Sequence, residues 1–365
     1  MTRKQILWWG RHGNYGPGYP RNRTIMRCMK QLDWVVNEFQ PAISALGSQQ
    51  AQLQHLSRPD AVWVPCFRQR DLAGAARWAR KQSVPIFFDP LISAYDKRVF
   101  EKHKYPPDSR RAIRLLNRER RLFGMADHVI ADTECHKAFF VETLNCDADR
   151  VVVIPVSAEE ELFRFQPMPV DTGKPEVLFF GTFIGLQGPK YIAQMLRHYT
   201  GPEFRLTFLG DGPEHPECER IARSFSNDAI EVAFEPWIPF EQLPDRIAQS
   251  SICLGIFGTG KKSSRVIPNK VYQALACGRP VITMQGDAYP DALFTGPPHR
   301  LTQPARGIRF VEPGNPEAIA TAICDLLTAL TARESANRES EAAFDIYKTW
   351  FSNETIRATL RSLIG

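Results

Sequence analysis

Short apolar runs recur along the first half of the chain, and stretches with helical periodicity lie between them. We expect buried strands at residues 6–9, 34–39, 61–64, 85–88, 128–131 and 151–154. Helices are expected between these runs, for example at Asp71–Lys81, Ser109–Phe123 and Glu134–Leu144. Strands that alternate with helices of this length predict a parallel sheet covered on both faces. The first half is therefore predicted to be one doubly wound α/β domain.

The same alternation restarts after the proline-containing stretch Phe165–Pro175, where we place a linker. Further strands are expected at residues 177–180, 205–209, 230–234, 252–256, 281–284 and 308–311, with helices at Lys270–Cys277, Pro316–Leu330 and Phe344–Ile364. We predict two Rossmann-like domains, 1–165 and 166–340, and a C-terminal helix in 341–365 that packs back on the first domain. The carboxyl ends of both sheets are expected to face a ligand-binding cleft.

Length and composition agree with this organisation. The 365 residues suit two domains, and 43% apolar with 24% charged residues is typical of a globular protein. No apolar run approaches the roughly 20 residues that span a bilayer, and the run at the N-terminus is too short for a signal peptide. The eight cysteines are scattered without a Cys-x-x-Cys motif, which predicts free thiols in a cytoplasmic protein.

Positive charge is concentrated in the first half. Residues 1–165 hold 26 Lys and Arg against 18 Asp and Glu, whereas residues 166–365 hold 20 against 22. Ten of the basic residues lie between Lys97 and Arg121, interleaved with apolar side chains. This stretch fits a helix that presses on anionic lipid through Arg110, Arg111, Arg114 and Arg118. A solvated helix face over a core stripe fits equally well, and no nucleic-acid-binding module is recognised, so no nucleic-acid partner is expected.

Several segments, in this order and spacing, resemble glycosyltransferase family 4. They are Gly10-Arg-His-Gly-Asn-Tyr-Gly-Pro-Gly18, Ala126-Asp-His-Val-Ile-Ala-Asp-Thr133, Val152-Val-Ile-Pro155, Leu178-Phe-Phe-Gly-Thr182, Leu206-Thr-Phe-Leu-Gly-Asp-Gly-Pro213 and Pro268-Asn-Lys-Val-Tyr-Gln-Ala-Leu-Ala-Cys-Gly-Arg-Pro-Val-Ile-Thr283. The resemblance covers nearly the whole chain. It implies the GT-B fold, in which two doubly wound Rossmann-like domains face a central cleft.

The resemblance also implies an activity. Family members are retaining, metal-independent hexosyltransferases of glycan and polysaccharide biosynthesis. The second domain would hold a UDP- or GDP-sugar as co-substrate, and the first would hold a glycan or lipid-linked acceptor, at the inner face of the cell membrane. No cofactor or metal is expected. Two alternatives remain open, namely a catalytically inactive GT-B binding partner and a GT-B sugar-nucleotide epimerase or phosphorylase.

The predicted nucleotide-sugar site combines glycines with the start of a helix. Glycines let backbone amides approach a diphosphate closely, and a helix N-terminus beside an ammonium group suits an anion. On these grounds and on the resemblance, the expected binding residues are Gly13, Gly16, Gly181, Lys261, Arg265, Asn269, Lys270 and Gln273. An ordinary surface loop would also explain glycines 13, 16 and 18, and a capped core helix would also explain residues 270–277.

The chain departs from the family at four positions. Family members carry Glu-x7-Glu where this chain has Arg265 and Gln273. Their phosphate-binding Arg and Lys align with Thr182 and Gln187. Glutamine can still donate and accept hydrogen bonds, but the diphosphate charge must be met by the cations at 261, 262, 265 and 270.

Asp89 is the candidate catalytic residue. It ends the expected strand Ile86-Phe-Phe-Asp, where family members place residues that touch the transferred sugar or the acceptor. It could equally cap the turn that follows. The resemblance implies no protein nucleophile, so positioning and charge stabilisation would dominate catalysis.

Three other motifs do not change this interpretation. Gly255-Ile-Phe-Gly-Thr-Gly-Lys-Lys262 lacks the closing Ser or Thr of a P-loop. Asp147-Ala-Asp149 matches a metal-binding Asp-x-Asp but lies in an expected polar turn. A dehydrogenase fingerprint would need a third glycine where Arg21 stands.

Overall fold

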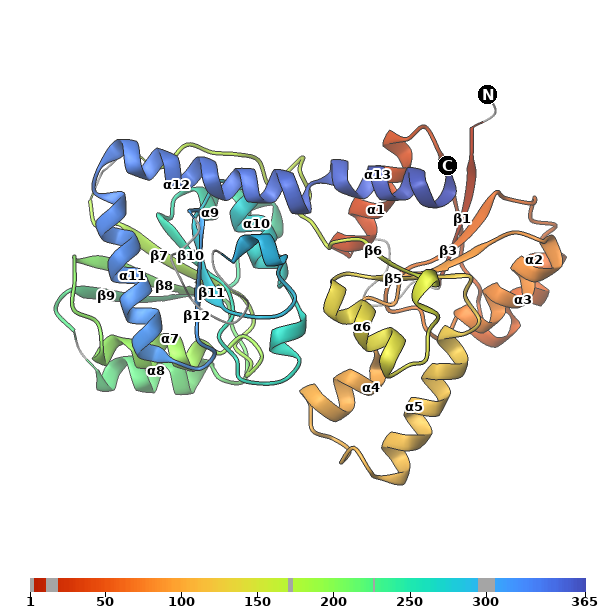
Figure 1. The fold of residues 1–365 in the computed structure, drawn as a ribbon, viewed down its shortest axis with the longest axis horizontal. Helices are drawn as coiled ribbons and strands as arrows, with labels where there is room; N and C mark the ends of the chain where they lie inside the picture. Colours follow the sequence, from red (N-terminus) through yellow and green to blue (C-terminus); the bar gives the residue numbers. More distant parts are fainter. Residues whose placement is uncertain (1–2, 11–18, 170–172, 226, 295–305) are drawn as a thin grey trace. The chain divides into compact units, whose positions relative to one another are not determined.

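The computed structural model describes residues 3–10, 19–169, 173–225, 227–294 and 306–365 (Figure 1). The chain forms two compact units, one made of residues 1–157 with 353–365 and the other of residues 158–352. Each unit contains one six-stranded sheet in which every pairing is parallel. The predicted fold class, two doubly wound α/β units, is confirmed.

The sheet of the first unit has the order β2-β1-β3-β4-β5-β6. Its strands are β1 Gln5–Trp9, β2 Val35–Phe39, β3 Ala61–Val64, β4 Ile86–Phe88, β5 His128–Ala131 and β6 Val151–Val153. The helices of this unit are α1 Pro20–Gln31, α2 Gly47–Leu53, α3 Leu72–Gln82, α4 Ala94–Asp96, α5 Arg110–Phe123, α6 Glu134–Glu142 and α13 Asn353–Ile364, and a π-helical turn, Lys97–Glu101, follows α4.

Both faces of this sheet are buried because side chains alternate along each strand. Trp9 of β1 packs on one face with Trp78 of α3. Trp8 points to the other face, where the core includes Ile25 of α1 and Ile356 of α13. Helices α1 and α13 lie side by side over that face (Figure 1). The last helix of the chain is therefore part of the core of the first unit.

The sheet of the second unit has the order β12-β11-β10-β7-β8-β9. Its strands are β7 Glu176–Phe180, β8 Phe204–Leu209, β9 Ile230–Glu235, β10 Ile252–Leu254, β11 Val281–Met284 and β12 Ile308–Val311. The helices are α7 Pro189–Gln194, α8 His215–Ser224, α9 Leu243–Ala248, α10 Asn269–Ala276, α11 Pro316–Leu330 and α12 Arg333–Ile346. In both units the strands lie where the apolar runs predict them, within two residues at each end.

The stretch proposed as a linker is attached to the second unit as far as residue 169. Arg279 is completely buried, and its guanidinium donates to the carbonyls of Gln166 at 3.0 Å and Pro167 at 2.7 Å. The Phe165 ring lies 5.1 Å from the Phe344 ring. The chain passes from one unit to the other at Ser157 instead, before the predicted position. The composition of residues 165–175 could not predict this attachment, because the contacts come from Arg279 and Phe344, which are distant in the sequence.

The C-terminal segment is not the single helix expected at 344–364. Helix α12 ends at Ile346 and continues as a π-helical turn, Tyr347–Phe351, before Ser352 takes an extended conformation. The turn belongs to the second unit, where Phe351 packs on Tyr272 with ring centroids 5.0 Å apart. Helix α13 then belongs to the first unit. Within the described ranges, no helix is long and apolar enough to cross a membrane.

Candidate functional site

Three loops meet at the carboxyl ends of the strands in the second unit. A Cβ atom on Gly258 would lie 2.4 Å from the Gly185 carbonyl and 2.5 Å from that of Leu186, so the loops after β7 and β10 pack backbone against backbone. Gly181 directly follows β7 with φ +153°, and a Cβ there would lie 2.6 Å from the Lys270 Nζ. This backbone conformation is one that L side chains rarely adopt, so position 181, beside the start of α10, favours glycine.

Lys270 is the second residue of α10 and is the most unusual group of this site. Its side chain is 5% exposed, and Nζ donates to the Gln187 Oε1 at 2.6 Å. Nζ also lies 3.7 Å from the Phe179 ring centroid. Among the residues that the structure describes, no carboxylate pairs with this ammonium group. Burial lowers the pKa of Lys270 well below its usual value, so the site favours an incoming negative charge.

The beginning of α10 adds further donors to this position. Asn269 is the first residue of the helix, and Pro268 precedes it without a side-chain cap for the backbone N–H groups. Such a helix start attracts anions. Gln273 lies one turn after Asn269 and is 7% exposed. The structure thus brings three predicted residues, Gly181, Lys270 and the helix start at Asn269, into one place.

The other predicted cations of this unit lie on the loop that leads to α10. Lys261 is exposed and Arg265 is half-buried. The loop is anchored to the glycine loop after β7, because the Ser263 hydroxyl donates to the Leu186 carbonyl at 3.3 Å. Lys262, which the sequence suggested as a further candidate, is 6% exposed. The glycines expected to take part from the first unit, Gly13 and Gly16, lie outside the described residues.

Asp89, the candidate catalytic residue, is held in a buried ion pair. The Arg21 Nε donates to both carboxylate oxygens, at 2.8 and 3.0 Å, and the two side chains are 1% exposed. The Arg21 Nη1 donates to the carbonyls of Ile154 at 3.2 Å and Pro155 at 3.0 Å. The Asp89 carboxylate also accepts from the backbone of Leu91, as expected for a cap on the following turn. This group ties α1 to the ends of β4 and β6.

A second buried pair lies at the end of the neighbouring strand. Asp132 follows β5, and its carboxylate contacts the His136 Nδ1 on α6. Burial alone would raise the pKa of Asp132, but His136 and then Arg21 lower it, and the net shift is downward. Burial alone would lower the pKa of Arg21, but Asp89 and then Asp132 raise it. The carboxyl edge of this sheet therefore carries a connected set of charges.

Sequence reasoning missed Arg21, Asp132 and His136. The sequence shows that Arg21 follows a glycine-rich stretch and that Asp132 follows an expected strand. Asp132 also lies inside a segment that carries the family resemblance. Nothing in the local pattern paired them, because Arg21 and Asp89 are 68 residues apart. The pairing requires knowledge of the strand order.

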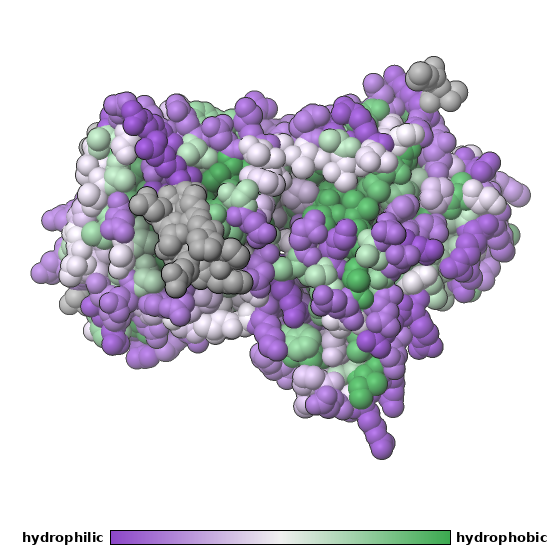
Figure 2. All heavy atoms as spheres, viewed as in Figure 1, coloured by the Kyte–Doolittle hydropathy of each residue, from purple (hydrophilic) through white to green (hydrophobic). Residues whose placement is uncertain are grey.

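The four arginines expected to contact lipid lie on helix α5. Arg110, Arg111, Arg114 and Arg118 are all exposed. Of these four, Arg118 alone also lines a cavity inside the first unit. Helix α5 has an exposed face of basic residues with the apolar Ile113 among them, 47% exposed. Figure 2 shows hydrophilic surface with a few hydrophobic patches in this region of the molecule.

The remaining motifs have local explanations in the structure. Asp147 caps a 3-10 turn, with its Oδ1 accepting from the Asp149 backbone at 3.1 Å. No cluster of three or more His, Cys, Asp and Glu side chains is arranged to hold a metal within the described portion of the chain. All eight cysteines are free thiols, as their spacing predicted.

Comparisons with known proteins agree with this architecture. A family model described as "Glycosyl transferase 4-like domain" matches residues 22–157, and one described as "Glycosyl transferases group 1" matches residues 174–329. The two matches fall on the two α/β halves of the chain. A comparison with curated proteins gave no match.

Several solved structures share the fold. The Anabaena protein Alr3699/HepE in complex with UDP and glucose has 16% identity and a TM-score of 0.65, with 99% of each chain covered. The same protein in complex with UDP-glucose has 15% identity and a TM-score of 0.65. A glycosyltransferase from Rickettsia africae has 14% identity and a TM-score of 0.65, covering 100% of this chain and 98% of the other. These likenesses confirm the GT-B fold.

The Arg21–Asp89 pair can be tested as a stabilising element. We expect Asp89→Asn to lower the free energy of unfolding of the first unit by about 3–5 kcal/mol, because Arg21 would remain buried without its partner. The double variant Arg21→Met, Asp89→Leu should recover most of that loss. Urea unfolding followed by tryptophan fluorescence measures both, with the exposed Asp108→Asn as control. Unchanged stability in Asp89→Asn would contradict this role and favour a role in chemistry alone.

Lys270 should destabilise the folded chain in a pH-dependent way. Its pKa is lower in the folded than in the unfolded state, so the cost is largest at pH values below the folded pKa and disappears near the unfolded value of about 10.4. Lys270→Met should therefore raise the free energy of unfolding, by about 1.4 kcal/mol per unit of lowered pKa at most. The gain should be larger at neutral pH than near pH 10. The exposed Lys348→Met is the control, and a gain independent of pH would refute the assignment.

Proposed function

Because the chain belongs to the family 4 type of glycosyltransferases, we propose that it transfers a hexosyl group from a UDP- or GDP-sugar to a glycan or lipid-linked acceptor with retention of configuration. The observation that carries this proposal is the buried, carboxylate-free Lys270 between Gly181 and the start of α10. A nucleotide diphosphate supplies the negative charge that this position lacks. The Anabaena protein of the same fold, solved in complex with UDP and with UDP-glucose, supports this choice of ligand.

In this proposal the second unit binds the nucleotide sugar. The Lys270 ammonium and the first N–H groups of α10 contact the diphosphate, and Gly181 leaves room for it. Gln273 replaces the second glutamate of the family motif as a hydrogen-bonding partner of the ribose hydroxyls. Because Lys270 has a lowered pKa before binding, the bound diphosphate should raise that pKa and take up protons. Lys261 and Arg265 on the neighbouring loop add positive charge.

The proposed transfer needs no protein nucleophile. The bond between the anomeric carbon and the leaving phosphate oxygen breaks, and the acceptor oxygen bonds to the same face of that carbon. The leaving phosphate oxygen accepts the proton of the acceptor hydroxyl. The protein then contributes by positioning the reactants and stabilising the charge of the departing nucleotide diphosphate. Neither a metal nor an organic cofactor enters this scheme.

Binding without transfer is the competing function. It is favoured by Arg265 and Gln273 in place of the family's glutamate pair. An epimerase differs from both, because it would convert a nucleotide sugar without an acceptor. Product analysis with and without an acceptor separates the three activities.

Nucleotide binding gives the direct test of the proposed function. In a thermal-shift series of UDP, GDP, ADP and their sugars, we expect UDP or GDP to stabilise the protein by about 2.7 kcal/mol at 100 times its Kd. Lys270→Ala should weaken that nucleotide by about 1.5–3 kcal/mol, measured by calorimetry, and Lys348→Ala should not. Unchanged affinity in a folded Lys270→Ala variant would remove Lys270 from the site.

The same assay has an arm for metal dependence. Sugar transfer or nucleotide-sugar hydrolysis should persist in EDTA, because the proposed charge stabilisation comes from Lys270 and the start of α10. Loss of turnover in EDTA with recovery on adding Mn²⁺ would contradict the metal-free scheme.

We further propose that the first unit contacts an anionic membrane surface at the cytoplasmic side through α5. The exposed arginines at 110, 111, 114 and 118, with the exposed Ile113, provide the basic and apolar groups that such contact uses. Each basic residue near anionic lipid contributes about 1 kcal/mol, so a few together give reversible binding. A lipid-linked acceptor would then be reached from the surface on which it resides.

Vesicle sedimentation tests this contact. Replacing Arg110, Arg111, Arg114 and Arg118 by Gln should reduce binding to anionic vesicles, and added salt should weaken binding of the unchanged protein. Replacing the exposed Arg80 and Lys81 of α3 is the control for net charge. Turnover on a short water-soluble acceptor should change little when only Arg110, Arg111 and Arg114 are replaced, since the nucleotide site lies in the other unit and none of these three lines the cavity of the first unit. If the unchanged protein does not bind anionic vesicles at low salt, the proposed contact is wrong.

A further inference from the structure

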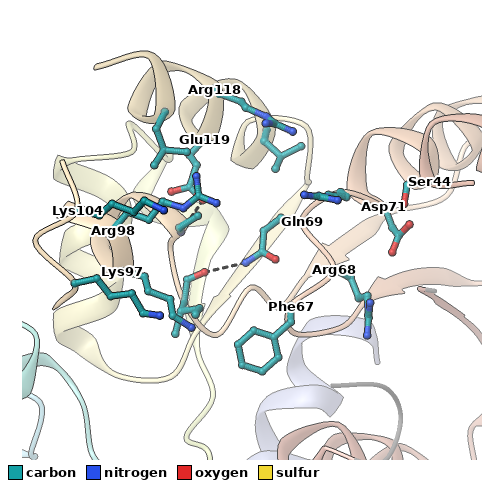
Figure 3. A pocket seen from close by; sticks show the side chains of 16 residues that line it. Ser44, Phe67, Arg68, Gln69, Asp71, Lys97, Arg98, Lys104, Arg118 and Glu119 are labelled. Atoms are coloured by element: carbon teal, nitrogen blue, oxygen red, sulfur yellow. Dashed lines mark hydrogen bonds between the residues drawn. The ribbon is translucent and has the colours of Figure 1, made fainter. Parts of the chain in front are cut away.

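A cavity of about 670 Å³ lies entirely within the first unit (Figure 3). It is formed by the loop after β3, the segment from Ile92 to Lys104 that follows β4, and one face of α5. In an open parallel sheet the carboxyl ends of the strands are where ligands bind. The volume is in the range of small-molecule sites. The cavity therefore has both the position and the size of a substrate site.

The lining is strongly cationic. Seven of the sixteen lining residues are Lys or Arg, whereas two are acidic. Six of the basic residues form no ion pair with any residue that the structure describes, and these six are Arg68, Arg70, Arg98, Lys102, Lys104 and Arg118. They come from three separate segments of the chain and surround the hollow. Figure 3 shows Arg98 and Lys104 on one side of the cavity and Arg68 on another.

One of the two acidic groups of the lining is already used by the backbone. The Glu119 carboxylate is 3% exposed and accepts from the Ser93 hydroxyl at 2.5 Å, the Ala94 N–H at 2.9 Å and the Tyr95 N–H at 2.8 Å. It thereby fixes the start of α4 to α5. The second, Asp71, is 2% exposed at the start of α3. The Glu119 carboxylate is thus occupied by its three donors at residues 93–95. Through them it holds the start of the segment that carries the basic residues.

The backbone that carries the cations is also fixed. The Lys104 N–H donates to the Arg98 carbonyl at 2.8 Å, and the Gln69 Nε2 donates to the Ile92 carbonyl at 3.0 Å across the cavity wall (Figure 3). Phe67, at the cavity's edge, has φ +62°, a left-handed conformation that is costly for an aromatic residue. Strained residues of this kind gather at binding sites. The backbone around the cavity is therefore held by hydrogen bonds, while the Arg98 and Lys104 side chains that it carries are exposed.

We propose that this cavity binds a phosphate or diphosphate group of the acceptor. Converging Arg and Lys side chains with no carboxylate partner are the groups that proteins use for phosphoryl oxygens. The inference rests on the proposed function, because it assigns the acceptor's chemistry to a glycosyltransferase whose donor binds in the other unit. It adds a second anion site, separate from the one at Lys270. It also explains why the excess positive charge of the chain is confined to the first half.

Two pairs of exposed cations in the first unit give matched variants for the test. Arg98→Gln with Lys104→Gln removes two cations of the cavity, and Arg80→Gln with Lys81→Gln removes two exposed cations of α3 outside it. The probe is inorganic diphosphate, titrated by calorimetry into each full-length variant. All four residues are exposed, so both variants should fold, and circular dichroism checks this.

We expect the cavity variant to bind inorganic diphosphate at least about tenfold more weakly than the unchanged protein, since two charge-assisted contacts are lost. The variant outside the cavity should retain nearly the original affinity. Equal weakening in both variants would mean that net charge alone attracts the anion, and the proposal would fail. No weakening in the cavity variant would also overturn it.

Two further arms identify the source of the group and keep this inference separable from the proposed function. A soluble sugar 1-diphosphate is compared with phosphatidylcholine vesicles that contain a minor fraction of polyprenyl diphosphate. Loss of binding to either probe in the cavity variant alone supports the proposal and names the source. UDP affinity should be unchanged in the cavity variant and reduced in Lys270→Ala. Failure of both UDP and GDP to bind any variant would refute the nucleotide site while leaving the cavity result intact.

Discussion

Burial of both faces of each sheet is the constraint on which the rest of this structure depends. When side chains on both faces pack under helices, the buried positions along the strands are mostly apolar. Charged residues that do chemistry or bind ligands must then lie at the strand ends. In both units the groups of interest, Asp89 and Asp132 in one and Gly181 with Lys270 in the other, lie at or beside carboxyl ends of strands.

Two buried charged groups beside strand ends, Arg21 in the first unit and Lys270 in the second, are compensated in different ways. In the first, Arg21 and Asp89 neutralise each other, and the remaining donors of Arg21 reach backbone carbonyls. In the second, the Lys270 ammonium has an amide oxygen and an aromatic face in place of a carboxylate. A paired buried charge supports the fold, whereas an unpaired one favours a ligand of opposite charge. The Arg21–Asp89 pair is thus a structural feature, whereas Lys270 is the proposed binding position.

The departures from the family pattern have a consistent physical interpretation. Gln187 stands where the family carries a phosphate-binding lysine, and it accepts a hydrogen bond from Lys270. Both cations that the family resemblance implies for the glycine loop are thus absent, since Thr182 and Gln187 stand in their places. Gln187 instead holds the ammonium group of Lys270 on α10. In the first unit the cations that surround the cavity far outnumber the acidic residues, of which Glu119 serves the backbone. In the proposed scheme, anion recognition is therefore distributed between the two units.

The sequence by itself determined the strands, the fold class and the segment that carries Lys270. Periodicity over a few residues is a local property, so helix α11 at Pro316–Leu330 and strand β11 at Val281–Met284 could be placed from the pattern alone. The tertiary structure decided which charges meet. Arg21 lies 68 residues from Asp89, and Gln187 lies 83 from Lys270, so each pairing follows from strand order. The same holds for the cavity, whose cations come from three segments that only folding brings together.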